Sequence, residues 1–395
     1  MTRSVPRRSF LMGSLGLGAI GSTSLGMLVP ACRDGENNLT SEAKPVRSSA
    51  NSSASSAINW KMPGEELEHE RTWMCWPSSA VIWGDELEAV QDEIATIALA
   101  VADFEPVSML CRQEELEFLR EEFGSDIEFI PAPVDDLWAR DTLPCFVTGT
   151  GSGGTTRLAA GRFRFNGWGG KQVHSGDTQL TALVATHLNI PLLESGITGE
   201  GGGIEVDGAG TVLAARSSWI NDNRNPSMSE ADVTLAITKL LGANRVIWVD
   251  GLAGADITDG HIDTLARFID ERTIAIDVPA FEDADDPWVE VAATTRSQLE
   301  TARTADGEPY EIVEIVQPES PRGDGSEFLA TYMNYYVCNG AVIAPEFGDA
   351  KADVAAEALL ASRFPGREIV MLNIDALAGG GGGIHCATQQ QPKLT

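Results

Sequence analysis

The chain has 395 residues, with 28 Lys and Arg against 58 Asp and Glu, which gives a formal net charge of −30 at pH 7. A surface this acidic argues against nucleic-acid binding, because phosphate contacts need clustered Lys and Arg. It also disfavours a polybasic membrane-binding surface and would attract cationic ligands. With 43% hydrophobic residues, most of the chain can bury a core of ordinary density.

Residues 1–32 resemble a twin-arginine export signal and are set apart from the fold. Arg7 and Arg8 precede an uncharged, Gly- and Ser-rich stretch that ends at Cys32. A transmembrane helix of ~20 residues would carry more Leu, Ile and Val. The alternative is a chance Arg pair ahead of a short anchor helix. We expect export by the twin-arginine route, to the cell envelope or to the outside of the cell.

The end of this stretch, Leu28–Cys32, resembles a lipobox, in which Cys32 would be lipidated after cleavage. Loss of residues 1–31 removes three Arg and no acids, so 25 basic residues would face 58 acidic ones, a net charge of −33. Residues 33–58 are rich in Ser and Asn and are expected to form a disordered tether. Residues 59–395 are then expected to form one folded domain.

The other five Cys are an odd number at wide spacings, without a CxxC motif or a metal-like Cys/His cluster. This pattern favours free thiols, one of which could be reactive, over a disulfide scaffold.

Hairpins, helices and single strands alternate along the folded domain. The first unit, from about Glu70 to Ile130, is the least regular. Four later units begin near 143, 204, 263 and 330, roughly 60–67 residues apart, and their helices are expected near 176–188, 229–241, 287–303 and 350–363. Five units predict a closed radial α/β arrangement, a five-bladed propeller. The alternative is a doubly wound sheet, which expects single strands between its helices.

A glycine run near the C-terminus, Gly379–Gly383, precedes Cys386. Consecutive glycines leave backbone amides uncovered and let a ligand approach closely. A Cys just beyond them is a candidate nucleophile, which any neighbour that favours the thiolate would activate. The alternative is a flexible linker, but only nine residues follow Cys386 and a linker would have nothing to join.

His261 and Asp263 lie at the start of a β-rich run, where alternation would place both side chains on one face. A His can transfer protons while a carboxylate holds a cationic substrate. By itself a His-x-Asp pair is more often a polar strand surface.

A third group comprises Asp135–Asp141, with Trp138 inside it, and Glu200 followed by three Gly. An Arg between acids is usually a surface ion pair worth ~0–1 kcal/mol. A planar aromatic beside carboxylates can however cover a planar cation. A guanidinium group is planar and is matched by carboxylates in bidentate geometry. Two Asp to grip it, a Cys to attack its central carbon and a His to manage protons would suffice to expel ammonia.

These residues occur in seven segments that resemble the agmatine deiminase and bacterial, Porphyromonas-type peptidylarginine deiminase family of the pentein superfamily. The segments follow the family order and cover roughly residues 60–392: ERTWMCWP (70–77), DDLWARDTLP (135–144), FNGWGGK (165–171), EGGGIEVDG (200–208), NRNP (223–226), HIDTLARF (261–268) and GGGGIHCATQQQP (380–392). The family fold is a five-bladed, pseudo-symmetric α/β propeller, the pentein fold.

The resemblance also implies a role for each matching residue. Cys386 would be the nucleophile, His261 the general acid and base, and Glu200 the group that orients His261. Asp141 and Asp263 would clamp the guanidinium, and Trp138 would line the pocket. Two positions depart from the pattern, Leu143 where relatives often hold Gly and Gly383 where many hold Asn, and both bear on substrate preference. His385 receives no role.

The first hypothesis is an exported hydrolase that converts agmatine to N-carbamoylputrescine and ammonia, a step of putrescine and polyamine biosynthesis, through a covalent amidino-cysteine intermediate. The alternative within the class is a peptidylarginine or other guanidine deiminase that produces citrulline. An alternative of another class is a non-catalytic surface lipoprotein that binds polyamines or guanidines, although a binder needs no nucleophile.

The deiminase chemistry needs no metal or organic cofactor. The expected partner is a small cationic guanidine, without nucleic acid and with membrane contact only through a lipid anchor, and a homodimer is left open.

Overall fold

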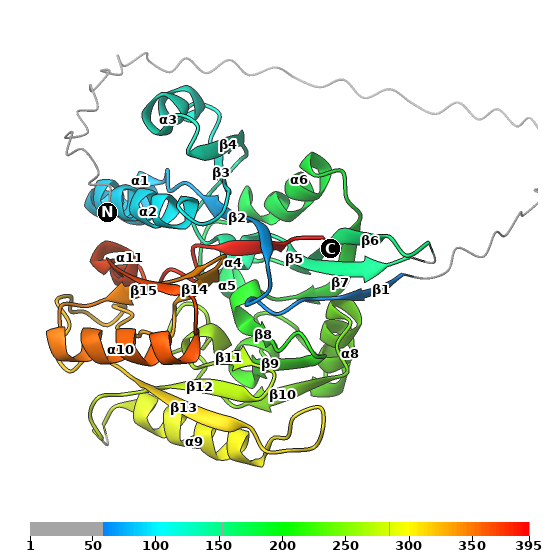
Figure 1. The fold of residues 1–395 in the computed structure, drawn as a ribbon, viewed down its shortest axis with the longest axis vertical. Coiled ribbons are helices and arrows are strands. Elements are labelled where there is room, and N and C mark those ends of the chain that lie inside the picture. The colour runs from blue at the N-terminus through cyan, green and yellow to red at the C-terminus, as the bar shows by residue number, and fades with distance from the viewer. Residues whose placement is uncertain (1–57, 152, 284, 395) are drawn as a thin grey trace, which may run out of the picture. The chain divides into compact units, whose positions relative to one another are not determined.

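The computed structural model describes residues 58–151, 153–283 and 285–394, so the predicted signal, Cys32 and residues 33–57 of the predicted tether lie outside the described residues. Within the described residues the strands form five separate sheets, which follow one another around the molecule in Figure 1. In hydrogen-bonding order the sheets are β17 (Gln389–Pro392), β2 (His69–Cys75), β3 (Val107–Cys111) and β4 (Ile127–Pro131); β1 (Asn59–Lys61), β5 (Cys145–Thr150), β6 (Thr156–Arg164) and β7 (Leu192–Thr198); β8 (Ile204–Val206), β9 (Thr211–Ala215) and β10 (Arg245–Val249); β11 (Ala266–Asp270), β12 (Thr273–Val278) and β13 (Glu311–Val316); and β14 (Tyr336–Cys338), β15 (Ala341–Glu346) and β16 (Glu368–Asn373).

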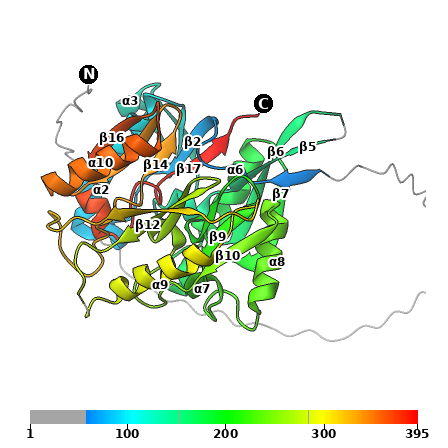
Figure 2. The same ribbon diagram turned by 60° about the horizontal axis from the view of Figure 1, so that its bottom comes forward.

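Helices connect the strands, and α8, α9 and α10 lie on the outside of the molecule in Figures 1 and 2. The longer helices are α2 (Leu87–Ala102), α3 (Leu116–Phe123), α6 (Leu180–His187), α8 (Glu230–Leu241), α9 (Pro287–Thr301) and α10 (Ala350–Arg363). The short ones are α1 (Ala80–Trp83), α4 (Ala139–Thr142), α5 (Gly167–Gly170), α7 (Arg216–Trp219) and α11 (Asp375–Gly379), with 3-10 turns η1 (Gly84–Glu86), η2 (Asp177–Gln179), η3 (Gly201–Gly203) and η4 (Ile262–Thr264). Across the described ranges no helix has the length and apolar character needed to cross a bilayer.

Four of the five sheets contain the predicted unit of a hairpin, a helix and a parallel strand. In the third sheet β8 and β9 pair antiparallel, α8 crosses over, and β10 pairs parallel to β9. A parallel neighbour needs such a crossover because the chain must return to the same end of the sheet. The units β5–β6–α6–β7, β11–β12–α9–β13 and β14–β15–α10–β16 repeat this order. The fold is the α/β propeller that the sequence predicts.

The outer helices begin where the sequence supplies an N-terminal cap. Ser229 accepts a hydrogen bond from the Asp232 N–H and completes a capping box at the start of α8. Asp286 caps α9, whose first residue is Pro287, and Asp349 caps α10. These local signals explain why the sequence places all three helices within one or two residues of their observed bounds.

The first sheet is completed by the C-terminal strand. β17 pairs antiparallel with β2, with Gln389 opposite Trp73, and the two lie side by side in Figure 1. The Trp73 Nε1 hydrogen also donates to Gln391 Oε1 at 2.9 Å. The first unit looks irregular in the sequence because its antiparallel strand comes from the other end of the chain. This pairing anchors the segment that carries Cys386.

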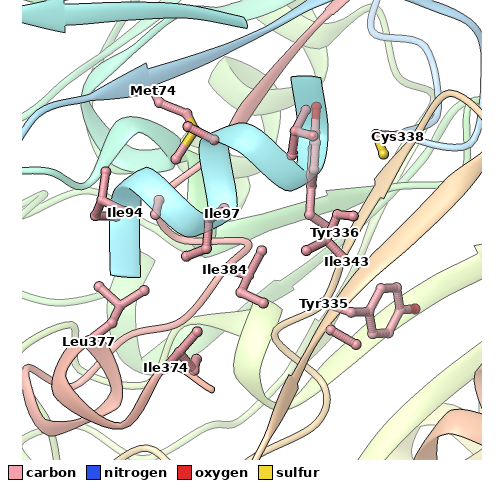
Figure 3. Close-up of a cluster of buried hydrophobic side chains, with 14 of the residues drawn as sticks. Met74, Ile94, Ile97, Tyr335, Tyr336, Cys338, Ile343, Ile374, Leu377 and Ile384 are labelled. Atoms are coloured by element: carbon pink, nitrogen blue, oxygen red, sulfur yellow. The ribbon is translucent and has the colours of Figure 1, made fainter. Parts of the chain in front are cut away.

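The largest hydrophobic cluster lies beneath the same segment. Ile384, two residues before Cys386, is fully buried among Ile97 of α2 and the neighbouring Ile374 and Leu377, as Figure 3 shows. Burying a side chain of this size stabilises the fold by ~1.5–3 kcal/mol. The core therefore holds the Cys386 backbone on one side while β17 holds it on the other.

The segment around His261 differs from the expectation. The sequence predicts a strand from Gly260 onward, but residues Ile262–Thr264 form the turn η4, and β11 starts only at Ala266. Gly260 has a φ of 83°, a left-handed conformation that lets the chain turn here. The predicted strand is wrong at this point, because the local turn replaces the alternation of a strand.

Candidate active site

The residues singled out from the sequence converge on one cavity. Trp138, Asp141, His261, Asp263 and Cys386 line a cavity of about 670 Å³. Glu200 lies behind His261 and contacts its ring. Four separate connections between sheets supply these side chains, so the propeller brings together segments that lie far apart in the sequence. Cys32, the predicted lipidation site, lies outside the described residues.

Cys386 lies between α11 and β17, and its backbone is held on both sides. Its N–H donates to Asn334 Oδ1 at 3.1 Å, and its carbonyl accepts from the Arg140 N–H at 3.0 Å. Its Sγ accepts from Asn334 Nδ2 at 3.2 Å and lies 3.5 Å from Asp263 Oδ2. Burial and the carboxylates of Asp263 and Asp141 raise the pKa of the Cys386 thiol well above its usual value. Without a cation beside it, the thiol is therefore protonated.

The His261 ring lies between two carboxylates. Its Nε2 is 3.4 Å from Glu200 Oε2, and its Nδ1 is 3.7 Å from Asp141 Oδ1. Burial alone would lower the pKa of His261, but Asp141, Glu200 and Asp263 outweigh it and raise the pKa to about 9. His261 is thus an imidazolium at neutral pH and carries a proton that it can give to a leaving group.

Glu200 is fixed from behind by a buried cation. Arg224 Nε donates to Glu200 Oε1 at 2.8 Å, and Arg224 Nη1 donates to Asp259 Oδ2 at 2.8 Å. The Arg224 side chain is fully buried, so both of its carboxylate partners are shielded from water. This arrangement fits the role of orienting His261 that the sequence resemblance implies for Glu200.

Asp141 and Asp263 stand beside the thiol but have different partners. Asp141 accepts from Trp168 Nε1 and from the Gly202 N–H, at 2.8 and 2.9 Å. Burial raises the pKa of Asp141, although His261 opposes this effect. Asp263 Oδ2 accepts from His385 Nδ1 at 2.8 Å, whereas its buried Oδ1 has no hydrogen-bond partner among the described residues.

The net charge environment of Asp263 favours the carboxylate. Burial raises its pKa, but the nearby His385, His261 and Arg267 lower it by more, so its pKa falls below the usual value. Asp263 therefore presents a carboxylate whose Oδ2 lies beside the Cys386 thiol and whose Oδ1 is an unused acceptor. A buried acceptor without a partner is unfavourable until a donor arrives.

Residues 61–392 match the model of the Porphyromonas-type peptidyl-arginine deiminase family. The chain belongs to this family. It is 32% identical over 362 residues to an agmatine deiminase of Pseudomonas aeruginosa, an alignment that covers 85% of this chain and 96% of that protein. It is 31% identical over 364 residues to an agmatine deiminase of Medicago truncatula, covering 84% and 96%.

The fold of this deiminase is also similar to a solved structure, the agmatine deiminase of Enterococcus faecalis. The TM-score is 0.77 at 28% sequence identity, and the match covers 85% of this chain and 96% of that one. Family membership places the protein among the hydrolases that act on carbon–nitrogen bonds of linear amidines.

Glycines of the deiminase site make room for its own side chains. A Cβ on Gly382 would lie 2.2 Å from a Trp138 ring carbon, and a Cβ on Gly202 would lie 2.7 Å from His261 Nδ1. At both positions the absence of a side chain lets a ring of the protein itself lie close to the backbone. Gly379 and Gly382 both line the cavity, and nothing lies within 4 Å of the Cβ position of Gly379.

Sequence reasoning missed several polar partners of the deiminase site. Trp168 and Arg224 fall inside matching segments, yet their roles depend on contacts with residues far along the chain. Asn334, which contacts both the backbone and the Sγ of Cys386, lies in none of the seven segments. His385 was noticed without a role, and its partners become clear only in three dimensions.

Proposed function

We propose that the protein hydrolyses the guanidinium group of agmatine to give N-carbamoylputrescine and ammonia, with Cys386 as the nucleophile. The observation that carries this proposal is the placement of two carboxylates, Asp141 and Asp263, beside a thiol and an imidazolium in one cavity. The agmatine deiminases to which the chain is similar support the choice of substrate.

The wider cavity favours a substrate with two positive ends. Seven Asp and two Glu line it, and no Lys or Arg does among the residues that the structure describes. Trp83 and Trp138 stand in its wall with their ring centroids 6.0 Å apart. Carboxylates pair with guanidinium N–H groups, and aromatic faces attract cations. Free arginine would bring a carboxylate into this acidic space, whereas agmatine brings an ammonium.

Substrate binding prepares the nucleophile. The guanidinium would lie between Asp141 and Asp263, and its charge would offset the two carboxylates that hold the Cys386 thiol protonated. The pKa of the thiol would then fall, and its proton would leave to solvent. The thiolate forms because the cationic substrate is present.

The first half of the reaction forms a covalent intermediate. Cys386 Sγ would donate an electron pair to the central guanidinium carbon and form a carbon–sulfur bond. His261 would give its proton to one terminal nitrogen, and the carbon–nitrogen bond would break to release ammonia. The enzyme would then carry an amidino group on Cys386.

The second half restores the enzyme. Neutral His261 would take a proton from a water molecule, whose oxygen attacks the same carbon. The carbon–sulfur bond would break, the electron pair would return to Cys386, and the remaining proton of the attacking water would pass to that sulfur, which becomes a thiol again. The product is a substituted urea, N-carbamoylputrescine, and His261 is again an imidazolium.

The test is to incubate the protein with agmatine, free arginine and an arginine-containing peptide, and to measure ammonia. We expect release from agmatine, with a kcat/KM at least ~10-fold above the other two, since one lost ionic contact is worth about that factor. Preference for the peptide would establish the alternative, a peptidylarginine deiminase. Release from none of the three would contradict deiminase activity and leave the guanidine-binding lipoprotein.

We further propose export by the twin-arginine route and a lipid anchor on Cys32. The paired Arg7 and Arg8 and the lipobox-like Leu28–Cys32 support this proposal. Replacing both arginines with Lys should keep the protein inside the cell, as fractionation would show. Unchanged export of that variant would contradict the proposed route.

A further inference from the structure

His385 lies directly behind Asp263, on the side away from the cavity, and is almost fully buried. Its Nδ1 is 2.8 Å from Asp263 Oδ2, and its Nε2 is 3.0 Å from Glu65 Oε2. A carboxylate accepts hydrogen bonds, so each ring nitrogen must carry a hydrogen to satisfy both contacts. An imidazole with a hydrogen on both nitrogens is a cation. The geometry therefore assigns a positive charge to His385.

Glu65 is held from several directions by hydrogen bonds. Its Oε1 accepts from Arg267 Nη2 and from the Val337 N–H, each at 3.0 Å. Its Oε2 accepts from Arg140 Nη2 at 3.0 Å as well as from His385. Burial raises the pKa of Glu65, but Arg267, His385 and Arg140 lower it by more, and the pKa falls well below its usual value. Glu65 is a fixed anion with its acceptors filled.

The charged groups around His385 come from every element that packs against it. Asp263 from η4 faces Nδ1, while Glu65 and, at 3.6 Å, Glu205 of β8 face Nε2. Arg267 of β11 pairs with both Glu65 and Glu205, at 3.0 and 2.8 Å. Arg267 and Arg140 already neutralise the carboxylates of Glu65 and Glu205. The charge of His385 therefore remains to compensate Asp263.

This arrangement determines which oxygen of Asp263 is free. His385 takes up Oδ2, and Oδ1 is buried without a partner. We propose that Glu65 and His385 form a positioning pair, in which Glu65 holds a His385 imidazolium that orients Asp263 and leaves Oδ1 for a guanidinium N–H of the substrate. The pair touches no reacting atom, so both are positioning residues. The inference rests on the proposed function of the site.

The direct test is nitrogen-15 NMR of the protein labelled in its five His residues, with the His385 signals assigned by their loss in His385→Gln. We expect both His385 ring nitrogens of the native protein to carry hydrogens, because each of them faces a carboxylate. A neutral His385 would overturn the proposal. This measurement needs no variant that must stay active and no catalysis.

The kinetic test uses Glu65→Gln, with Glu68→Gln as the matched control because Glu68 is exposed and pairs with Lys393 at the surface. In Glu65→Gln we expect KM for agmatine to rise about 10-fold to 100-fold, the usual effect of losing a charge-assisted hydrogen bond, with a smaller change in kcat. The control should match the native enzyme.

The outcomes separate this inference from the proposed function. A native enzyme that releases ammonia from agmatine, together with a folded Glu65→Gln variant of unchanged KM, would overturn the positioning pair alone. A native protein inactive on every guanidine would remove the proposed function, and the NMR result would still decide the charge of His385. If Glu65→Gln fails to fold, the NMR result on the native protein decides.

Discussion

The Sγ of Cys386 lies 3.5 Å from Asp263 Oδ2. At this distance a thiolate and a carboxylate would repel each other. This contact and burial keep the sulfur protonated in the empty site. A cationic substrate must therefore promote formation of the thiolate, a role that a neighbouring base fills for other catalytic cysteines. The reactivity of Cys386 should depend on pH and on the charge of the molecule beside it.

Alkylation with iodoacetamide should inactivate the enzyme by modifying Cys386, and agmatine should protect it by filling the cavity. The rate of inactivation should still be rising at pH 9, because the pKa of the thiol lies well above 9 and only the thiolate reacts. The other four described cysteines are buried, so they should react more slowly. Peptide mass spectrometry would locate the modification, and full activity with Cys386 alkylated would contradict the assignment.

The pKa of His261, about 9, predicts how stability and activity change with pH. Since this pKa lies above the unfolded value of about 6.5, the stabilisation is complete below pH 6.5 and is lost as pH rises through 9. The difference in melting temperature between the native protein and His261→Asn should therefore shrink as the pH rises from 6 to 10. Activity of His261→Asn should fall by about 10²–10⁴-fold, the usual contribution of a general acid. Equal differences in melting temperature at both pH values would contradict the assigned charge.

Asp277, at the wall of the cavity, is expected to make stability fall over a lower pH range than His261 does. Its carboxyl contacts Thr331 and Gln317, and burial raises its pKa to about 7. The folded state keeps a proton that the unfolded state has already released, so stability falls as pH rises from about 4 to 7 and stays lower above that range. Asp277→Asn should remove this fall and stabilise the protein at pH 8 by up to ~4 kcal/mol, but hardly at pH 4. Urea unfolding at both pH values would show whether the gain is confined to pH 8.

Gly202→Ala should damage catalysis more than folding. The new methyl group would approach His261 Nδ1 to 2.7 Å and Asp141 Oδ1 to 2.9 Å, so both side chains must move. A displacement of this order in a catalytic group can lower kcat by about 10²-fold. Gly151→Ala is the control, because nothing lies within 4 Å of its Cβ position. Equal kcat values for the two variants would show that His261 and Asp141 tolerate the displacement.

Local signals in the sequence account for most of the fold. The Asn339–Gly340 turn and the caps Ser229, Asp286 and Asp349 act over a few residues, so the hairpin and helices that they define could be predicted. The pairing of β17 with β2 could not, because Trp73 and Gln391 are 318 residues apart and neither signals the other. The predicted strand at His261 failed because a local turn replaced it.

The same difference between local signals and long-range contacts applies to the residues of the candidate site. Cys386, His261 and the three carboxylates stand in segments whose composition and order carry information, so they could be proposed from the sequence. Asn334 and Glu65 act through hydrogen bonds to residues far along the chain, which no local pattern encodes. The charge of His385 follows from two partners that lie 122 and 320 residues away.

Covalent catalysis by Cys386 can be tested by rapid acid quenching of the enzyme during turnover of agmatine, followed by mass analysis of the peptide that contains Cys386. We expect ammonia release and, on Cys386 alone, an added mass equal to agmatine less ammonia. Cys386→Ala should form neither product nor adduct. Undiminished ammonia release by Cys386→Ala would contradict covalent catalysis by this cysteine.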